Sequence, residues 1–194
     1  METLQLRIIG DSPILMHSDR LANPLDPLKK EMALYTGKRK KTDEDHEMIA
    51  FLEWKAAMYW DVKAGPYLPG RMLKSALIRG ATKSKDGPKI KTGAVVLTDK
   101  APLEYDGPRD QAALWGLGTW TDMRSVVVQR ARLMRCRPIF PEWSARFEVV
   151  FDPAVIDQRD LLRIAETTGQ MVGLGDYRVE RGGDFGRFHV EVAA

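Results

Sequence analysis

The chain has 194 residues, of which 44% are hydrophobic and 29% charged, a composition typical of one soluble globular domain. Its apolar runs are too short to span a membrane, its first residues lack a secretory signal, and its single cysteine, Cys136, excludes an intramolecular disulfide and a multi-cysteine zinc site. We therefore expect a cytoplasmic protein with no membrane partner.

The net charge is only +3, but the cations are clustered along the sequence. Basic runs occupy residues 38–41 and 74–91, and six arginines between Arg124 and Arg146 stand against one acid, Glu142. Such clusters favour phosphate binding, because that binding depends on local charge. The alternative is an ordinary solvated surface.

The first half of the chain predicts one strand and three helices. Leu4, Leu6 and Ile8 alternate with polar residues, as in a strand with one buried face. A short helix is expected over 25–35, and a longer one from the N-cap Thr42 to about residue 60. After the turn at Pro69-Gly70, a basic helix is expected over 70–83.

A short strand is then predicted at 94–97, followed by an irregular excursion over 98–124 that carries Trp115 and Trp120. Residues 126–135 are expected to form one strand, with a turn at Pro138–Pro141. That strand should pair in a hairpin with the strongly alternating segment 143–151.

The C-terminal part predicts a helix capped by Asp157 that ends near Val172, and a last strand near 188–192. Between them, the eighteen residues Gly173–Val190 include a glycine-rich loop with Gly173, Gly175, Gly182, Gly183 and Gly186. Glycine permits close backbone approach, so this loop could admit an anionic ligand. The alternative is a helix C-cap followed by a long hairpin.

This order of elements favours an α+β fold. It fits a ferredoxin-like, RRM-like antiparallel sheet with two helices on one face. We expect a single domain over 1–194, with large insertions at about 19–66 and 98–124.

Three segments resemble the RAMP superfamily, the RNA-binding backbone subunits and RNA-processing proteins of CRISPR complexes. Residues Tyr67–Arg79 resemble the segment that opens the first core helix of that superfamily, although Ser75 replaces a usual glycine. Gly173–Phe188 resembles its glycine-rich loop, and Ile9–Ser18 is similar to its first strand and the loop that follows. The resemblance implies a compact, phage-type relative that binds single-stranded nucleic acid in head-to-tail assemblies.

Binding of single-stranded nucleic acid requires a cationic track and flat side chains on which bases stack. The candidate binding residues are Arg71, Lys74, Arg79, Lys83, Lys85, Arg124, Arg130, Arg132, Arg135, Arg137, Tyr177, Arg178, Arg181 and Arg187. Core packing is the alternative for the nearby Phe185. We expect Trp115 and Trp120 to contact a neighbouring protomer. We expect no nucleotide cofactor, because the glycines follow a helix instead of opening one, and no metal, because no two of the histidines have metal-ligand spacing.

The leading hypothesis is a non-enzymatic binder of single-stranded DNA or RNA that oligomerises along the strand. One alternative is a metal-independent endoribonuclease that uses His17, since RNA-processing RAMP proteins employ a histidine as general acid or base. Another is a module that contacts only protein, such as a decoy of a CRISPR complex.

Overall fold

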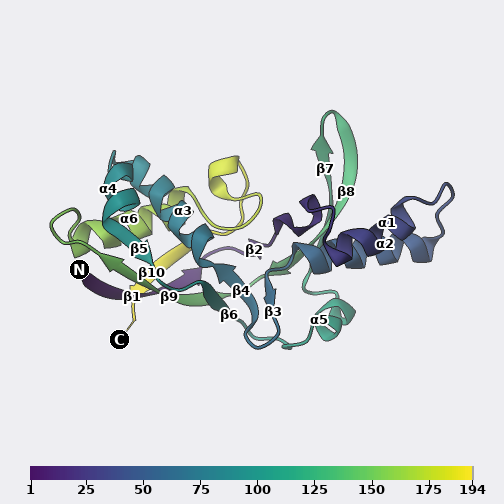
Figure 1. Ribbon diagram of the computed structural model, residues 1–194, viewed down its shortest axis with the longest axis horizontal. Coiled ribbons are helices and arrows are strands. Elements are labelled where there is room, and N and C mark those ends of the chain that lie inside the picture. Colours follow the sequence, from purple (N-terminus) through teal and green to yellow (C-terminus); the bar gives the residue numbers. More distant parts are fainter. Residues whose placement is uncertain (194) are drawn as a thin grey trace. The chain divides into compact units, whose positions relative to one another are not determined.

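A computed structural model describes residues 1–193, the side chain of Val128 excepted. Over these residues the chain is an α+β protein with six α-helices, a mainly antiparallel seven-strand sheet and a small three-strand sheet. Its contacts divide it into two compact units (Figure 1). Unit 1 comprises residues 1–14, 60–106 and 140–194, and unit 2 comprises 15–59 and 107–139.

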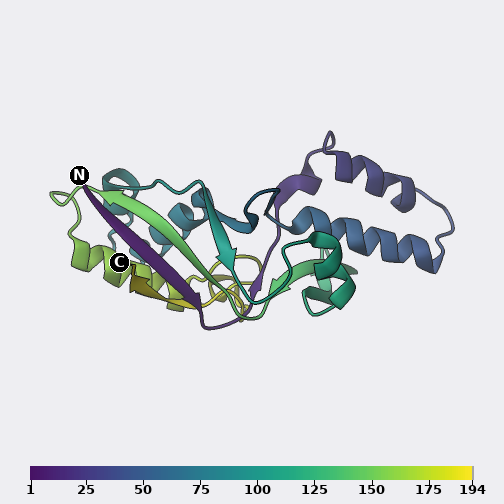
Figure 2. The same ribbon diagram turned by 90° about the horizontal axis from the view of Figure 1, so that it is seen from below.

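Unit 1 is organised around β1 (Glu2–Gly10), which pairs antiparallel with a strand on each side (Figure 2). Its neighbours are β9 (Ser144–Phe151) and β10 (Phe188–Val192). Leu4, Leu6 and Ile8 are buried, which confirms the alternation expected from the sequence. Beyond β9 lie the remaining strands β5 (Ala94–Val96), β6 (Lys100–Glu104), β4 (Gly65–Pro69) and β3 (Trp60–Asp61).

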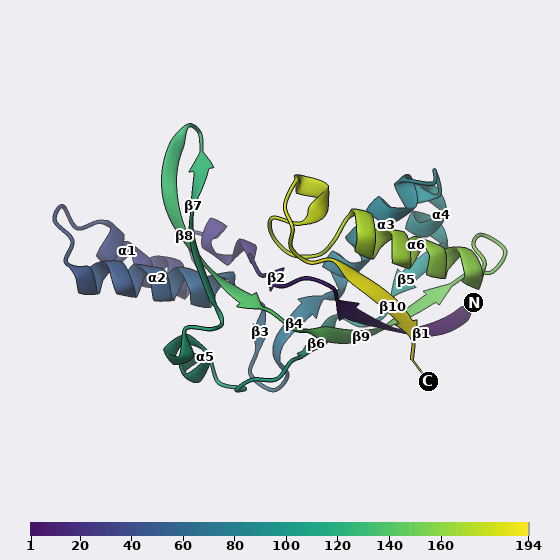
Figure 3. The same ribbon diagram turned by 180° about the vertical axis from the view of Figure 1, so that it is seen from behind.

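Two long helices, α3 (Gly70–Thr82) and α6 (Gln158–Met171), lie side by side on one face of this sheet (Figure 3). The shorter α4 (Gly87–Gly93) follows α3. Asp157 caps α6 by accepting a hydrogen bond from the Asp160 amide, as its sequence predicts. The apolar faces of both helices are buried and include Leu73, Ala76, Leu77, Leu161, Ile164 and Ala165.

Unit 2 contains a helical pair, α1 (Pro27–Thr36) and α2 (Asp43–Ala57), preceded by the short 3-10 helix Asp19–Ala22. Thr42 caps α2 with a reciprocal capping box: its hydroxyl oxygen accepts from the Asp45 amide, and the Asp45 carboxylate accepts from the Thr42 amide. The two helices pack through Leu28, Met32, Leu52 and Ala56. Both helices were therefore predicted correctly.

The other elements of unit 2 are α5 (Gln111–Leu117) and the hairpin β7 (Thr121–Val128) and β8 (Ala131–Phe140). β8 also neighbours the short β2 (Ile14–Leu15). The tip of the hairpin extends beyond α2 (Figures 1 and 3). In the register, Met123 lies opposite Cys136 and Val127 lies opposite Arg132.

The expected single strand over 126–135 is wrong. The chain reverses at Gln129 and Arg130, which have φ angles of 48° and 70°, and Val128 pairs with Ala131 across the turn. Two residues in the left-handed region form a tight hairpin turn, although glycine or asparagine usually occupies such positions. The sequence therefore carries no turn signal here.

The expected hairpin between 126–136 and 142–151 is also wrong. β9 pairs with β1 on one side and with β5 and β6 on the other, so neither of its edges is open to β8. Pro138 lies within β8, and the chain bends only after Phe140.

The segment 98–124 is not an irregular excursion, since it contains β6, α5 and the start of β7. Trp120 is only 8% exposed, and its carbonyl accepts a hydrogen bond from the Trp54 indole at 2.9 Å. The ring of Trp115 is half-buried and lies 5.3 Å from Phe51 and 5.5 Å from Trp54 between ring centroids. Phe51, Trp54 and Trp115 thus form an aromatic cluster inside unit 2, and Trp120 is bonded to it through its carbonyl.

The close packing of α3 against α6 generates a first prediction. A Cβ added at Gly80 would lie 1.9 Å from Thr168 Oγ1 and 3.0 Å from Thr168 Cα, so the helices would have to separate. We expect Gly80→Ala to lower the free energy of unfolding by about 1–3 kcal/mol in urea denaturation.

Gly116 in α5 is the matched control, because a Cβ there meets nothing within 4 Å. Gly116→Ala should raise stability by about 0.4–1 kcal/mol. Equal effects of the two substitutions would contradict the close helix contact.

Candidate nucleic-acid interface

Two of the predicted binding arginines lie at the tip of the hairpin in unit 2. Arg130 is in the turn and Arg132 is the second residue of β8, and both are exposed. Among residues 1–193 no carboxylate forms an ion pair with either guanidinium. These two cations are therefore available to phosphate groups.

The other arginines of this segment have different environments. Arg124 pairs with Asp122 on the same strand, with its Nε 2.8 Å from the carboxylate. Arg135 donates from Nη1 to Glu53 Oε1 of α2 at 2.7 Å. Arg137 is only 6% exposed, so its assignment as a surface binding residue is wrong. Of these five hairpin arginines, only Arg130 and Arg132 are exposed without an ion pair to another described residue.

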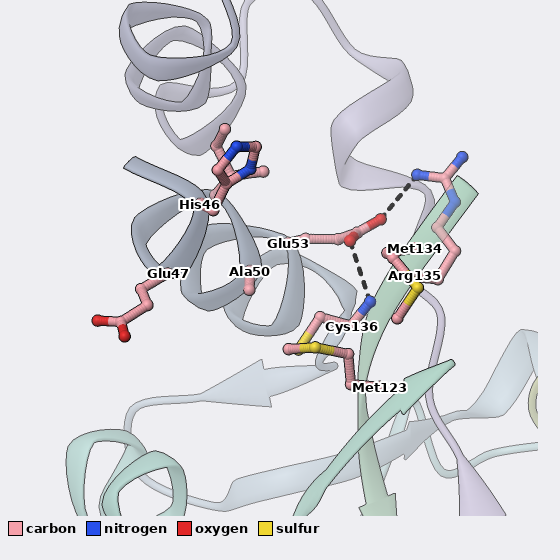
Figure 4. A pocket seen from close by; sticks show the side chains of 9 residues that line it. His46, Glu47, Ala50, Glu53, Met123, Met134, Arg135 and Cys136 are labelled. Atoms are coloured by element: carbon pink, nitrogen blue, oxygen red, sulfur yellow. Dashed lines mark hydrogen bonds and ion pairs between the residues drawn. The ribbon is translucent and has the colours of Figure 1, made fainter. Parts of the chain in front are cut away.

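A groove of 390 Å³ lies between α2 and the hairpin (Figure 4). Ile49 and Ala50 of α2 face Met123 and Met134 of the hairpin, which are 54% and 61% exposed. The sequence analysis missed this groove, because no local pattern places residues 46–53 beside residues 123–136.

Glu53 fixes the floor of the groove. Its buried carboxylate accepts hydrogen bonds from Arg135 and, at 3.0 Å, from the backbone amide of Cys136. Figure 4 shows the Glu53 side chain reaching from α2 to β8. Burial foremost, together with the nearby Glu53 and Asp122, raises the pKa of the Cys136 thiol to about 12, so this cysteine is not a nucleophile.

The second set of predicted residues lies in unit 1, where two of them have structural partners. Lys74 of α3 donates to the carbonyl of Ile90 at 2.5 Å and to that of Ala94, and its burial lowers its pKa. Arg79 donates to Glu180 in the glycine-rich loop at 3.0 Å, and Arg178 donates to the same carboxylate at 3.1 Å. Glu180 therefore joins α3 to the loop.

The remaining predicted cations of unit 1 are exposed side chains at several places. Arg187 donates to Gln170 at 2.6 Å. The exposed set comprises Arg71, Lys83, Lys85, Arg181 and Arg187.

The glycine-rich loop closes on itself, and this explains most of its glycines. A Cβ at Gly183 would lie 1.7 Å from the Tyr177 carbonyl oxygen, and one at Gly186 would lie 1.8 Å from that of Leu174. Gly173 donates its amide to the Thr168 carbonyl and so caps α6, as the sequence alternative proposed. The space beside these glycines is filled by the loop, which removes the argument that they admit a ligand.

One flat side chain remains accessible on this loop. Tyr177 is 48% exposed, and its ring centroid lies 6.3 Å from that of the half-buried Phe185. Stacking of a base on Tyr177 is sterically open, whereas Phe185 contributes mainly to packing.

The histidines give no support to metal or nuclease chemistry. Within residues 1–193, no group of three or more histidine, cysteine or acidic residues could hold a metal ion. His17 is exposed, and its backbone carbonyl accepts a hydrogen bond from the Tyr59 hydroxyl at 3.4 Å. His189 in β10 has its Nδ1 2.6 Å from Asp11 Oδ1. No helix over the same residues is long and apolar enough to cross a membrane.

Comparison with known proteins adds no relative. No protein-family model matches the chain, and a search of curated proteins found no similar sequence.

The ion pairs of Glu180 predict that the stability of the fold depends on pH. Partial burial opposes ionisation of Glu180, but hydrogen bonds from Arg79 and Arg178 outweigh it and lower the pKa of the carboxyl below 4.5. The stabilisation is therefore present above pH 4.5 and is lost as the pH falls through the folded-state pKa. Glu180→Gln should cost about 1 kcal/mol or less at pH 7.

At pH 3 the same substitution should cost less than at pH 7, as measured by thermal unfolding. Glu142→Gln, at an exposed position, is the control and should leave the stability unchanged at both pH values. A cost for Glu180→Gln that does not change with pH would show that the ion pairs are not its cause.

Proposed function

We propose that the protein is a non-enzymatic binder of single-stranded nucleic acid that assembles head-to-tail along the strand, in the manner of RAMP backbone subunits. The observation that carries this proposal is the hairpin β7–β8. It has two exposed arginines at its tip that form no ion pair with another described residue, and accessible apolar side chains along its length. Cations beside apolar contact surface suit a ligand with phosphates and bases.

The strand order of unit 1 supports the RRM-like part of the proposal. In chain order the elements β1, α3, β5, β9, α6 and β10 alternate as in a ferredoxin-like core. Across the sheet, the corresponding strands follow the order β10-β1-β9-β5. The segment Tyr67–Arg79 that resembles the RAMP motif forms the end of β4 and most of α3.

The burial of Trp120 changes the surface through which protomers would meet. Val127 and Leu133 of the hairpin are exposed apolar residues, and they replace Trp115 and Trp120 as the candidate contact. Deleting residues 98–124 is unsuitable as a test, because it would remove β6 from the central sheet.

The first test changes the hairpin tip. Arg130→Glu with Arg132→Glu should weaken single-strand binding in a mobility-shift assay. Each lost phosphate contact should reduce the slope of log affinity against log salt by about 0.7. Arg135 is left unchanged, because its reversal would place a second acid beside the buried Glu53.

The control carries the same charge change on exposed residues outside the candidate set, Lys30→Glu with Arg159→Glu. Single- and double-stranded DNA and RNA are compared in the same assay. Equal loss in both double variants would mean that only net charge matters, and no retention on any strand at low salt would favour a module that contacts only protein.

The second test addresses assembly. Oligonucleotides of increasing length should bind increasing numbers of protomers in analytical ultracentrifugation, because a head-to-tail contact does not close into a dimer. Val127→Ser should abolish this increase and preserve binding of a single protomer, because serine adds no charge opposite Arg132. One protomer per strand at every length would rule out the filament.

A further inference from the structure

The groove between α2 and the hairpin has walls that fit a flat aromatic ligand. Met123 and Met134 are flexible thioethers, which adapt to irregular shapes and make favourable sulfur–aromatic contacts. Opposite them, Ala50 leaves room on the α2 side (Figure 4). At 390 Å³ the groove lies at the small end of the roughly 300–1,000 Å³ range of ligand sites, so it takes a single base with its sugar.

The polar groups of the groove are fixed and directional. Glu53 holds one N–H of Arg135, and among residues 1–193 the other guanidinium N–H groups of Arg135 have no recorded partner. Arginine has five such donors in a rigid plane, so those remaining can bond the carbonyl or ring-nitrogen acceptors of a base. The Arg135 charge neutralises Glu53, and Figure 4 shows Glu47 pointing away from the hairpin.

The position of Arg132 identifies the occupant as a nucleotide and not an apolar protein segment. Along β8, Arg132, Met134 and Cys136 occupy alternate positions and so share one face of the strand. Arg135 leaves the strand from the other face and borders the groove through its contact with Glu53. Arg132 is therefore about 7 Å further along the strand than Met134, which is within reach of the phosphate of a base held at the methionines. An apolar protein segment has no group that would complement this cation.

We propose that the groove between α2 and β7–β8 binds one base of the single strand, with Met123 and Met134 against the face of the base, Arg135 at its edge and Arg132 on its phosphate. The proposal rests on the proposed function and adds to it a base-binding subsite. It implies that binding depends on bases as well as on the phosphate backbone.

The experiment compares homopolymers of thymidine and of uridine with abasic strands of the same length and backbone. The wild-type protein should bind the base-bearing strand about tenfold or more tightly than the abasic strand, as expected from the loss of base stacking. Ala50→Phe fills the groove and should bring this ratio close to one, since phosphate contacts remain. Ala33→Phe, at an exposed position of α1, is the matched control and should keep the wild-type ratio.

Met134→Ser is a second variant, and it should fold normally even if Ala50→Phe disturbs the packing, because the Met134 side chain is largely exposed. It should reduce affinity for the base-bearing strand several-fold and leave the abasic strand unaffected. The proposal is overturned if Ala50→Phe and Met134→Ser leave the ratio of base-bearing to abasic affinity unchanged. It is also overturned if these variants keep that ratio but lose self-association, because the groove would then bind a protein partner. Absence of wild-type binding to every strand would instead refute the proposed function itself.

Discussion

The fold of unit 1 depends on the burial of one face of β1. Leu4, Leu6 and Ile8 leave water only when β9 and β10 flank the strand and α3 and α6 cover it. The close approach of those helices requires a hydrogen at Gly80 in place of a side chain. The glycine-rich loop is bound to α3 through Glu180, so the packing of α3 also determines the position of the loop. The position of the glycine-rich loop at the surface of unit 1 therefore depends on the buried apolar residues between the helices and the sheet.

In unit 2 the corresponding constraint is the buried carboxylate of Glu53. A carboxylate removed from water must be compensated, and Arg135 and the Cys136 amide provide the compensation. These hydrogen bonds join α2 to β8, and they also fix the orientation of the Arg135 guanidinium beside the groove. The buried Glu53 thus holds the helix against the hairpin and positions the Arg135 side chain.

The sequence predicted the elements whose signals are local. Thr42 and Asp157 cap helices within a few residues of themselves, and the alternation in β9 needs no distant partner. The failures occur where the deciding contact is remote or atypical. The turn at Gln129 and Arg130 has no glycine, asparagine or proline. Trp120 is buried, and its carbonyl accepts a hydrogen bond from Trp54, which lies 66 residues earlier.

The same distinction applies to the candidate site. A run of arginines is visible in the sequence, but the acids that pair with them are not: Glu53 is 82 residues from Arg135, and Glu180 is 101 residues from Arg79. The sequence therefore indicated a basic surface, but it overestimated how many of the arginines are free of an acidic partner. The base-sized groove requires two segments to meet, so it could be found only in three dimensions.

The order in which the strands of unit 1 leave the ribosome has a consequence for biogenesis. β1 is made first, yet its two partners are made only after residue 143, and unit 2 is built from two segments that interrupt unit 1. Nascent β1 must therefore expose its apolar face for most of translation. Such non-local pairing slows folding and leaves collapsed intermediates open to aggregation. Chaperones that cover the apolar face of nascent β1 until β9 and β10 have been made would offset this exposure.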